Sequence, residues 1–366
     1  MNKAKAAVFM GANAPFEIRE FDIAPTPSGY GRSELIVSGV CGTDLHFHNG
    51  KLAVGAPSII GHEFIGRLVD LDEAEGAAYG LEVGDNVIAD IAVPCGCCPL
   101  CKSGDDANCI HMAVTNGGSI EDAPYLWGGY TEVNYTPLSN LIKIPDELDP
   151  AMVGVFACPG PTAQHAFALA ARAGVDMSTI QSAVVQGLGP VGMYAAMYLK
   201  AMGVEHVYAI SGGKQPARES LVLELGIEKV FVLAEQTAEE INRELMALTD
   251  GLGVDLVFEA SGAPSAVPQG MEILRNRGVY LIPGQYSNSG GISIQPQMIT
   301  FKALHIIGAS QYSVSDVKDY LTFLVEHPAY HDIIRRMAGR YAIEDVNAAF
   351  ADAKAGKNVK TVLVKG

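Results

Sequence analysis

The sequence predicts an α/β protein with two domains, a twisted, β-rich domain followed by a doubly wound parallel sheet covered by helices. Residues 1–157 hold short β-branched segments bounded by Gly, Asp and Pro, which favours a twisted sheet or barrel. From residue 158, strand-like segments alternate with helical ones, the pattern of a parallel α/β sheet. We place the second domain at 158–297, and expect 298–366 to complete its sheet and return to the first domain.

The predicted elements follow the chain in this order. The first domain contains the predicted strands SELIVSGV (33–40), FIGRLVD (64–70) and DNVIADIAV (85–93). The second contains the strands SAVVQG (182–187) and VDLVFEA (254–260) and the helices MYAAMYLKAMG (193–203) and ARESLVLELG (217–226). The segments VYLIPG (279–284) and LHIIGAS (304–310) are also apolar, and their pattern does not distinguish a helix from a strand. The tail 341–364 has the pattern strand, amphipathic helix, strand.

Composition narrows the possible partners and the compartment. A net charge of -16 repels phosphate backbones, so we expect no nucleic-acid partner. The chain has no uninterrupted run of eighteen apolar residues, so we expect no membrane-spanning helix. It begins without the apolar segment of a signal peptide and has only seven cysteines, which predicts a cytoplasmic protein.

Five of the seven cysteines lie between Cys95 and Cys109, and four of these predict a closed metal site. Their spacing is Cys-x2-Cys-x2-Cys-x7-Cys, with the ligands Cys95, Cys98, Cys101 and Cys109. A structural zinc ion takes four such sulfur ligands and leaves no position open for water. The alternative is a disulfide pair or a set of buried thiols. We favour zinc, and expect a structural role for this ion.

The segment VVQGLGPVG (184–192) predicts a dinucleotide-binding turn because it follows a predicted strand and precedes a predicted helix. The first glycine permits the tight turn, the second lets the backbone approach a pyrophosphate, and the third allows close packing of helix on strand. The pyrophosphate would lie at the helix N-terminus. The predicted cofactor-binding residues of this turn are Gly187, Leu188, Gly189, Pro190, Val191 and Gly192.

The next strand predicts which cofactor is bound. Enzymes that prefer NAD place an acidic residue about twenty residues after the turn. Here that place is occupied by Ser211 or Gly213, followed by Lys214 and Arg218. A cation beside an uncharged strand end suits a 2'-phosphate, so we predict NADP(H) over NAD(H). The alternative is that both cations are solvated charges at a helix start.

Further metal-ligating residue types lie in the first domain. Cys41 is in SGVCGTD, and His62 and Glu63 are in IIGHEFIG. A catalytic zinc ion keeps three protein ligands and one exchangeable position. Cys158, in FACPGPT at the junction of the predicted domains, is a candidate for the remaining ligand.

Together these motifs resemble the zinc-dependent medium-chain alcohol dehydrogenase family over essentially the whole chain. Cys41-Gly-Thr-Asp, Gly61-His-Glu, the four-cysteine loop, Gly128-Gly-Tyr-Thr-Glu and the glycine turn occur in the family's order. The resemblance implies a GroES-like catalytic domain joined to a Rossmann-type domain. It also implies two zinc ions, a catalytic one on Cys41, His62 and Cys158 and a structural one in the loop. Glu63 would be a neighbouring group or an interchangeable ligand.

The same resemblance implies roles for several neighbours of the metal. Thr43 would accept the alcohol proton and pass it by way of the cofactor ribose to His46, which would release it to water. Thr162 matches a position beside the nicotinamide, although it could instead cap its own helix. From the residues themselves, we expect Asp44 to accept the second ring N–H of His62, as carboxylates beside metal sites do; capping the turn after Thr43 is the alternative.

These expectations define a reaction class but leave its substrate open. We expect hydride transfer between a primary or secondary alcohol and the nicotinamide, with a polyol or sugar dehydrogenase as the alternative; family polyol enzymes often carry glutamate where Cys158 stands. A nicotinamide-binding protein without activity is the third hypothesis. Ile91, Trp127 and Tyr130 are candidates for the substrate pocket or for the core. The family resemblance suggests a homodimer or homotetramer.

Overall fold

The computed structural model describes residues 3–285 and 287–366, which form two compact units. Unit 1 comprises Met1–Pro161 and Gln311–Gly366, and unit 2 comprises Thr162–Ser310. The chain therefore changes unit inside one helix near residue 161 and again after Ser310. The first limit lies a few residues after the predicted 157/158 boundary. The second lies inside the segment 298–366, which also contains β15 (His305–Gly308), the last strand of unit 2.

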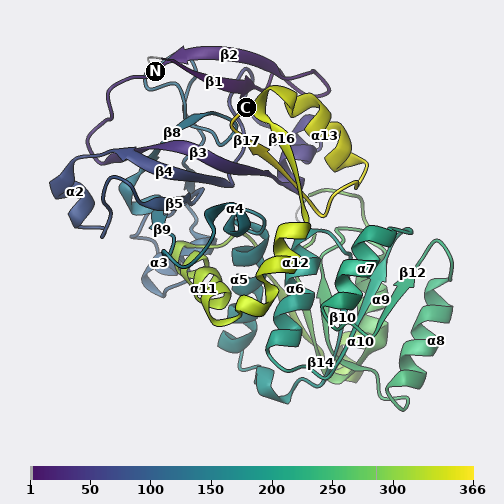
Figure 1. Ribbon diagram of the computed structural model, residues 1–366. Coiled ribbons are helices and arrows are strands. Elements are labelled where there is room, and N and C mark those ends of the chain that lie inside the picture. Colours follow the sequence, from purple (N-terminus) through teal and green to yellow (C-terminus); the bar gives the residue numbers. More distant parts are fainter. Residues whose placement is uncertain (1–2, 286) are drawn as a thin grey trace. The chain divides into compact units, whose positions relative to one another are not determined.

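Unit 1 is built on a mixed sheet with the strand order β16-β17-β3-β4-β5-β9, and β8 pairs with β3 (Figure 1). Apart from the parallel pair β16 and β17, neighbouring strands run antiparallel. Two short antiparallel pairs, β1 with β2 and β6 with β7, complete its strands. The strand bounds are β1 (Lys3–Val8), β2 (Glu17–Asp22), β3 (Tyr30–Val40), β4 (Phe64–Asp70), β5 (Asn86–Ala89), β6 (Ala92–Val93), β7 (Ala113–Val114), β8 (Val133–Pro137), β9 (Leu141–Lys143), β16 (Ala338–Ala342) and β17 (Lys360–Val364).

Short helices connect these strands. They are α1 (Gly42–His48), α2 (Glu73–Ala77), α3 (Pro99–Lys102), η1 (Asp106–Asn108), η2 (Leu138–Asn140), α4 (Pro150–Val153), α11 (Val314–Glu326), η4 (Pro328–Tyr330), α12 (His331–Arg336), η5 (Ile343–Asp345) and α13 (Val346–Lys354). Helix α5 (Pro159–Arg172) contains the change of unit.

An aromatic cluster in the core of unit 1 supports helix α1. The rings of Phe16 and Phe350 lie 4.6 Å apart, and Tyr130 meets Phe350 edge to face at 5.8 Å. His48, at the end of α1, stacks on Phe16 at 5.7 Å. Such aromatic pairs stabilise a fold by more than the burial of their apolar surface alone. The last turn of α1 is thereby held against the core, and the site described below lies at the other end of this short helix, where Cys41 is the N-cap.

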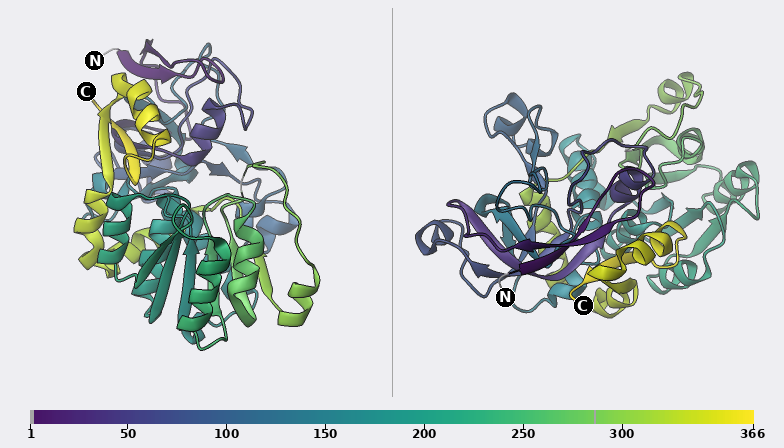
Figure 2. Two further views of the ribbon diagram at one scale, coloured as in Figure 1. Left: turned by 90° about the vertical axis from the view of Figure 1, so that its right-hand side faces the viewer. Right: turned by 90° about the horizontal axis from the view of Figure 1, so that it is seen from above.

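Unit 2 is a parallel sheet with the strand order β12-β11-β10-β13-β14-β15. Numbered along the chain within the unit, this is the order 3-2-1-4-5-6 of doubly wound dinucleotide-binding folds. Figures 1 and 2 show helices on both faces of the sheet. The strands are β10 (Ser182–Gln186), β11 (His206–Ser211), β12 (Lys229–Val232), β13 (Val254–Glu259), β14 (Leu274–Ile282) and β15 (His305–Gly308), and the helices are η3 (Met177–Thr179), α6 (Pro190–Ala201), α7 (Pro216–Glu224), α8 (Ala238–Leu248), α9 (Ala266–Ile273) and α10 (Gln297–Lys302).

The structure confirms the predicted fold class and refines some elements. VYLIPG and LHIIGAS contribute to the strands β14 and β15, which resolves the open choice. The tail forms β16, α13 and β17. The single strand predicted at 85–93 is wrong: it is two strands, β5 and β6, separated at Asp90, whose buried carboxylate accepts the backbone N–H of Ala92 at 3.2 Å.

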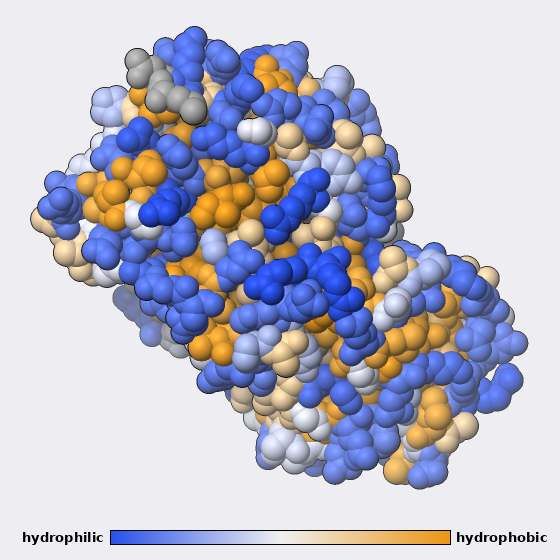
Figure 3. Space-filling view, viewed as in Figure 1, coloured by the Kyte–Doolittle hydropathy of each residue, from blue (hydrophilic) through white to orange (hydrophobic). Residues whose placement is uncertain are grey.

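Hydrophilic residues cover most of the face shown in Figure 3, and apolar residues form separate smaller areas on it. Among the described residues, no helix combines the length and the apolar composition that crossing a bilayer requires.

Candidate functional site

Four side chains from separate segments of unit 1 converge on one buried point. Cys41 is the N-cap of α1, His62 and Glu63 directly precede β4, and Cys158 directly precedes α5. One ligand atom from each lies within 4.8 Å of the others. The Sγ atoms of Cys41 and Cys158 are 3.9 Å apart, far beyond disulfide bonding. Two sulfurs bound to tetrahedral zinc at 2.3 Å are about 3.8 Å apart, so this donor set fits the metal.

The backbone around Cys41 and His62 explains how the ligands are held. The side chain of Asp44, at the third position of α1, accepts the backbone N–H of Cys41 at 2.9 Å. Gly61 has φ +93°, and a Cβ there would come within 2.6 Å of the ring of Tyr130. Glycine at this position therefore lets the His62 segment lie directly on that ring.

A buried carboxylate orients His62. Oδ1 of Asp44 lies 3.5 Å from Nδ1 of His62, and the hydroxyl of Tyr130 donates to Oδ2 of Asp44 at 2.7 Å. Burial lowers the pKa of His62, but Asp44 and Cys41 outweigh it and raise that pKa well above its ordinary value. With Nδ1 turned to Asp44, Nε2 is the ring atom available to a metal.

Tyr130 belongs to this support and not to a substrate pocket. Its side chain has no exposed surface, which decides for the core alternative. Burial, followed by the charge of Asp44, raises its pKa well above the ordinary value, so the phenol keeps the proton that it donates. Sequence analysis missed this role because the glycine motif around Tyr130 gave no sign of its partner.

A buried ion pair fixes Glu63. Nζ of Lys360 lies 2.6 Å from Oε1 and 2.5 Å from Oε2 of Glu63, and neither side chain is more than 1 % exposed. Burial raises the pKa of Glu63 to about 7, although the charge of Lys360 opposes the shift. Burial lowers the pKa of Lys360, but Glu63 and the cysteines more than compensate and raise it. Sequence analysis did not identify Lys360, which lies 297 residues from its partner.

The residues predicted to move protons lie on α1, beside Cys41. Thr43 is half-buried, and its hydroxyl accepts a weak hydrogen bond from the Cys41 thiol at 3.8 Å. His46 is one helical turn further on. Burial, followed by the charge of Lys51, lowers the pKa of His46, which favours release of a proton.

The four-cysteine loop forms a second cluster, in which Cys95, Cys98, Cys101 and Cys109 have their sulfurs within 4.8 Å of one another. The Sγ separations are 3.4 Å for Cys98 to Cys101 and 4.0 Å for Cys98 to Cys109. Both exclude a disulfide and suit tetrahedral sulfur ligands. The backbone amides of Cys97 and Cys98 lower the pKa of Cys95 to about 6, which favours the thiolate that zinc binds.

The glycine turn of unit 2 joins β10 to α6. Gly187 has φ +94°, and a Cβ on Gly192 would lie 1.9 Å from the carbonyl oxygen of Gly187. A Cβ on Gly189 would meet no protein atom within 4 Å, so this side of the turn is open to a ligand. Pro190 begins α6 and supplies a fixed φ without needing an N–H partner. These three glycine environments match the requirements of a bound pyrophosphate.

The predicted 2'-phosphate residues differ in their surroundings. Ser211 ends β11, and its hydroxyl donates to the Gly213 carbonyl at 2.7 Å. Lys214 is exposed and forms an ion pair with Glu235 at 2.7 Å. Arg218 lies against the turn instead: its Nη1 donates to the carbonyl oxygen of Leu188 at 3.2 Å. Of the two predicted cations, Arg218 is thus the one held at the glycine turn.

Two further residues named from the sequence, Thr162 and Trp127, lie in different surroundings. Thr162 lies in the first turn of α5 and is half-buried. Trp127 packs against Gly118, where a Cβ would come within 2.1 Å of the indole, and meets Tyr30 edge to face. Sequence analysis did not identify Tyr312, a buried side chain just before α11; burial and then the charge of Cys158 raise its pKa well above the ordinary value.

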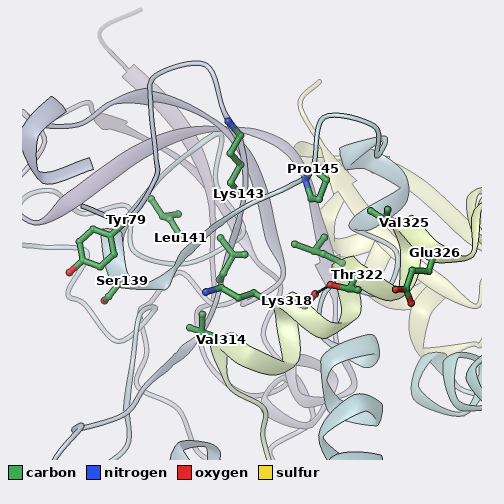
Figure 4. Close-up of a pocket in the computed structure, with 12 residues that line it drawn as sticks. Tyr79, Ser139, Leu141, Lys143, Pro145, Val314, Lys318, Thr322, Val325 and Glu326 are labelled. Atoms are coloured by element: carbon green, nitrogen blue, oxygen red, sulfur yellow. Dashed lines mark hydrogen bonds between the residues drawn. The ribbon is translucent and has the colours of Figure 1, made fainter. Parts of the chain in front are cut away.

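A groove of about 470 Å³ between β9 and α11 lies outside this cluster (Figure 4). Leu141 and Lys143 line it from the strand, and Val314, Lys318 and Val325 line it from the helix. The candidate metal ligands do not line this groove. We therefore do not assign the active site to this groove.

Comparisons with known proteins agree with this geometry. Residues 34–146 match the model of the alcohol dehydrogenase GroES-like domain, and residues 190–326 match that of the zinc-binding dehydrogenase. The chain is 30% identical to a sorbitol dehydrogenase of Halalkalibacterium halodurans, over 93% of each chain. It is 29% identical to a 5-exo-hydroxycamphor dehydrogenase of Pseudomonas putida, over 99% of each. It also resembles the structure of an alcohol dehydrogenase from Thermotoga maritima, with a TM-score of 0.89, 26% identity and full coverage of both chains.

Replacing Lys360 should reveal the cost of leaving Glu63 buried alone. We expect Lys360→Met to lower the free energy of unfolding by about 3–5 kcal/mol, because it removes the counterion of a buried carboxylate. Urea titration measures the loss. The control Lys360→Arg keeps the charge and should lose much less, and Glu63→Gln combined with Lys360→Met should recover most of the stability. An unfolding free energy of Lys360→Met equal to that of the unaltered protein would contradict this account.

Proposed function

Because the chain belongs to the zinc-binding medium-chain alcohol dehydrogenase family, we propose that it transfers hydride between a primary or secondary alcohol and NADP(H). Its class, an oxidoreductase of the zinc-type alcohol dehydrogenases, agrees with the enzyme predicted from the sequence. The observation that carries the proposal is the buried convergence of Cys41, His62, Glu63 and Cys158. A donor set of two thiolates, an imidazole and a carboxylate inside a dehydrogenase fold suits a catalytic zinc ion.

We propose two zinc sites with different roles. Cys41, His62 and Cys158 would hold the catalytic ion and leave one position for the alcohol, while Lys360 holds the Glu63 carboxylate nearby as an alternative ligand. Cys95, Cys98, Cys101 and Cys109 would enclose the structural ion completely. The closed sulfur set lacks the exchangeable position that catalysis requires.

Residues of unit 1 account for the proton chemistry of the proposed reaction. Zinc, when bound, would supply a Lewis acid that makes the alcohol hydroxyl more acidic. Oγ1 of Thr43 would accept the hydroxyl proton of the alcohol and pass it by way of the cofactor ribose to His46, which would release it to water. The lowered pKa of His46 supports this direction at neutral pH. Asp44 and Tyr130 would keep the ring of His62 fixed throughout.

The cofactor proposal follows from the end of β11. Ser211 and Gly213 leave this strand end uncharged, so no carboxylate there repels a 2'-phosphate. Arg218 lies beside the glycine turn and would supply the positive charge. Lys214 could contribute only by leaving Glu235, so we assign it the smaller part. Thr162 is proposed to contact the nicotinamide.

The substrate remains a choice between two classes of alcohol. The similarity to a 5-exo-hydroxycamphor dehydrogenase favours a secondary alcohol on an apolar skeleton. The similarity to a sorbitol dehydrogenase favours a polyol or sugar. We propose the simple alcohol first, since Cys158 stands where the family's polyol enzymes often carry glutamate. Turnover of a panel of alcohols and polyols decides between them, because a polyol enzyme would oxidise sorbitol-like substrates faster than simple alcohols.

We further propose that unit 1 is the catalytic domain and unit 2 the dinucleotide-binding domain of a cytoplasmic homo-oligomer. A reducing compartment is supported by the seven cysteines, none of which forms a disulfide. Association is supported by β15, the last strand in the sheet order of unit 2. The backbone groups along its outer edge can form hydrogen bonds with a strand of another chain. Apolar side chains are exposed near it, including Phe301 with 80% of its surface accessible and Ile306 with 38%.

Removing a catalytic ligand should abolish turnover and spare the fold. We expect His62→Ala to lower kcat about 1000-fold or more, since a Lewis acid contributes several kcal/mol to such a step. Formation of reduced nicotinamide measures turnover, and circular dichroism reports the fold. The control His206→Ala changes a half-exposed histidine at the start of β11 and should retain full activity. Retained turnover in His62→Ala would refute the assignment, as would loss of the folded state.

Changing the end of β11 should change the cofactor. We expect Ser211→Asp to reduce kcat/KM for NADP relative to NAD at least about tenfold, because a carboxylate repels the 2'-phosphate. Arg218→Ala should weaken NADP alone, and Lys214→Ala should have the smaller effect. Kinetics with both cofactors measure these ratios. A clear preference of the unaltered enzyme for NAD would rule out the NADP proposal.

Charge at the edge of unit 2 should prevent association. We expect Phe301→Lys to give a particle of the single-chain mass, 38.6 kDa, where the unaltered protein gives a multiple of it. Light scattering measures the mass. Leu252→Lys is the matched control, because Leu252 is 71% exposed but lies in the turn before β13. An unaltered protein of single-chain mass would exclude the proposed oligomer.

A further inference from the structure

The four-cysteine loop contains a fifth thiol that the proposed zinc site does not use. Cys97 is exposed, whereas Cys98 and Cys109 are buried and Cys95 and Cys101 are half-buried. The Cys97 Sγ lies 3.6 Å from the Cys95 Sγ and donates its S–H to it. Cys97 is therefore both the sulfur most open to solvent in the loop and an immediate neighbour of a proposed ligand.

The two sulfurs can approach without disturbing a packed core. Gly96 links the two cysteines with φ +68°, and a Cβ there would meet no atom within 4 Å. Disulfide bonding requires a separation of about 2.05 Å, so the sulfurs would have to close by about 1.5 Å. Gly96 is exposed and the space beside its Cα is open, which leaves room for that adjustment.

A second pair of sulfurs in the loop is about as close, but both of its members are proposed zinc ligands. Cys98 and Cys101 are 3.4 Å apart, slightly closer than Cys95 and Cys97. The Cys98 sulfur also accepts a hydrogen bond from the backbone N–H of Cys101 at 3.4 Å. Cys97 is the loop sulfur most accessible to a solvent-borne oxidant, because it is exposed and the other four cysteines of the loop are buried or half-buried.

We propose that Cys97 is a site of oxidative modification: hydrogen peroxide converts it to a sulfenic acid, and Cys95 then forms a disulfide with it. This inference rests on the proposed structural zinc ion. The consequence is that the ion loses one of its four ligands. The loop would thus be a reversible redox-responsive element in addition to a structural one.

The step balances with peroxide as the two-electron oxidant. The Cys97 thiol takes one oxygen from hydrogen peroxide, giving Cys97 sulfenic acid and one water. The Cys95 sulfur attacks that sulfur, an S–S bond forms, the S–O bond breaks, and the hydroxide leaves as a second water after taking the proton from the medium. The Cys97 thiol, the Cys95 thiolate, one proton and one peroxide thus become one disulfide and two waters. An added dithiol restores both thiols by exchange.

Loss of Cys95 opens the site, because three sulfurs no longer enclose the ion and its affinity falls. The cluster of Cys41, His62 and Cys158 contains only two sulfurs, and neither is exposed: Cys158 is buried and Cys41 is half-buried. We therefore expect the first zinc released by mild oxidation to come from the loop.

The test compares the zinc-loaded full chain with its Cys97→Ser variant, which keeps all four proposed ligands. Both proteins receive hydrogen peroxide in the presence of a chromophoric zinc chelator. Thiols are alkylated before and after reduction, and peptide fragmentation then locates the disulfide. We expect the unaltered protein to release one zinc ion per chain with a Cys95–Cys97 disulfide, and Cys97→Ser to release it at least about tenfold more slowly. A dithiol followed by zinc should restore the unaltered protein.

Two results would overturn the inference. One is equal zinc release from the unaltered protein and Cys97→Ser; the other is a first disulfide between Cys98 and Cys101 or between Cys41 and Cys158. Cys97→Ala, which lacks any hydroxyl, repeats the comparison should the serine variant fold poorly. Metal analysis before oxidation tests the premise separately: a loop without zinc would refute the structural site, while the disulfide map would still show whether Cys95 and Cys97 pair.

Discussion

The buried ion pair between Glu63 and Lys360 is the interaction on which the organisation of unit 1 depends. Two charges removed from water are costly unless each satisfies the other, and here both lie within 1 % of complete burial. Lys360 begins β17, which pairs antiparallel with β3, and Glu63 directly precedes β4 on the other side of β3. Between them stands Gly39, where a Cβ would lie 1.9 Å from Oε2 of Glu63. The C-terminal strand is thereby tied to the segment that carries His62 and Glu63.

The two cysteine-containing clusters are supported in different ways. The buried one depends on side chains from distant parts of the chain: Asp44 beside His62, Tyr130 beneath Asp44, and Lys360 beside Glu63. The loop depends on its own backbone, because amide groups within it donate to its sulfurs. Distant side chains can set the orientation and charge of a reactive group, as catalysis requires. Local amides suffice to hold a closed metal site, and they leave the loop exposed to solvent and oxidants.

Unit 2 shows the same division between local and distant effects. The roles of Gly187 and Gly192 follow from backbone geometry within one turn, so spacing alone could predict them. The charge beside the expected 2'-phosphate could not be predicted in the same way. Lys214 and Arg218 are equivalent in sequence terms, but Lys214 pairs with Glu235 after β12 while Arg218 bonds to Leu188 in the glycine turn.

The sequence by itself determined the fold class, the enzyme family, the four-cysteine loop and the glycine turn, because each depends on residues close together in the chain or on a strand–helix rhythm. It also named Cys41, His62, Glu63 and Cys158 through the family's motifs. Only the tertiary structure decided that these four side chains meet at one buried point, that Tyr130 supports Asp44, and that Lys360 neutralises Glu63. The reason is physical: burial and electrostatic pairing join groups up to 297 residues apart, and no local pattern records which strands will be neighbours.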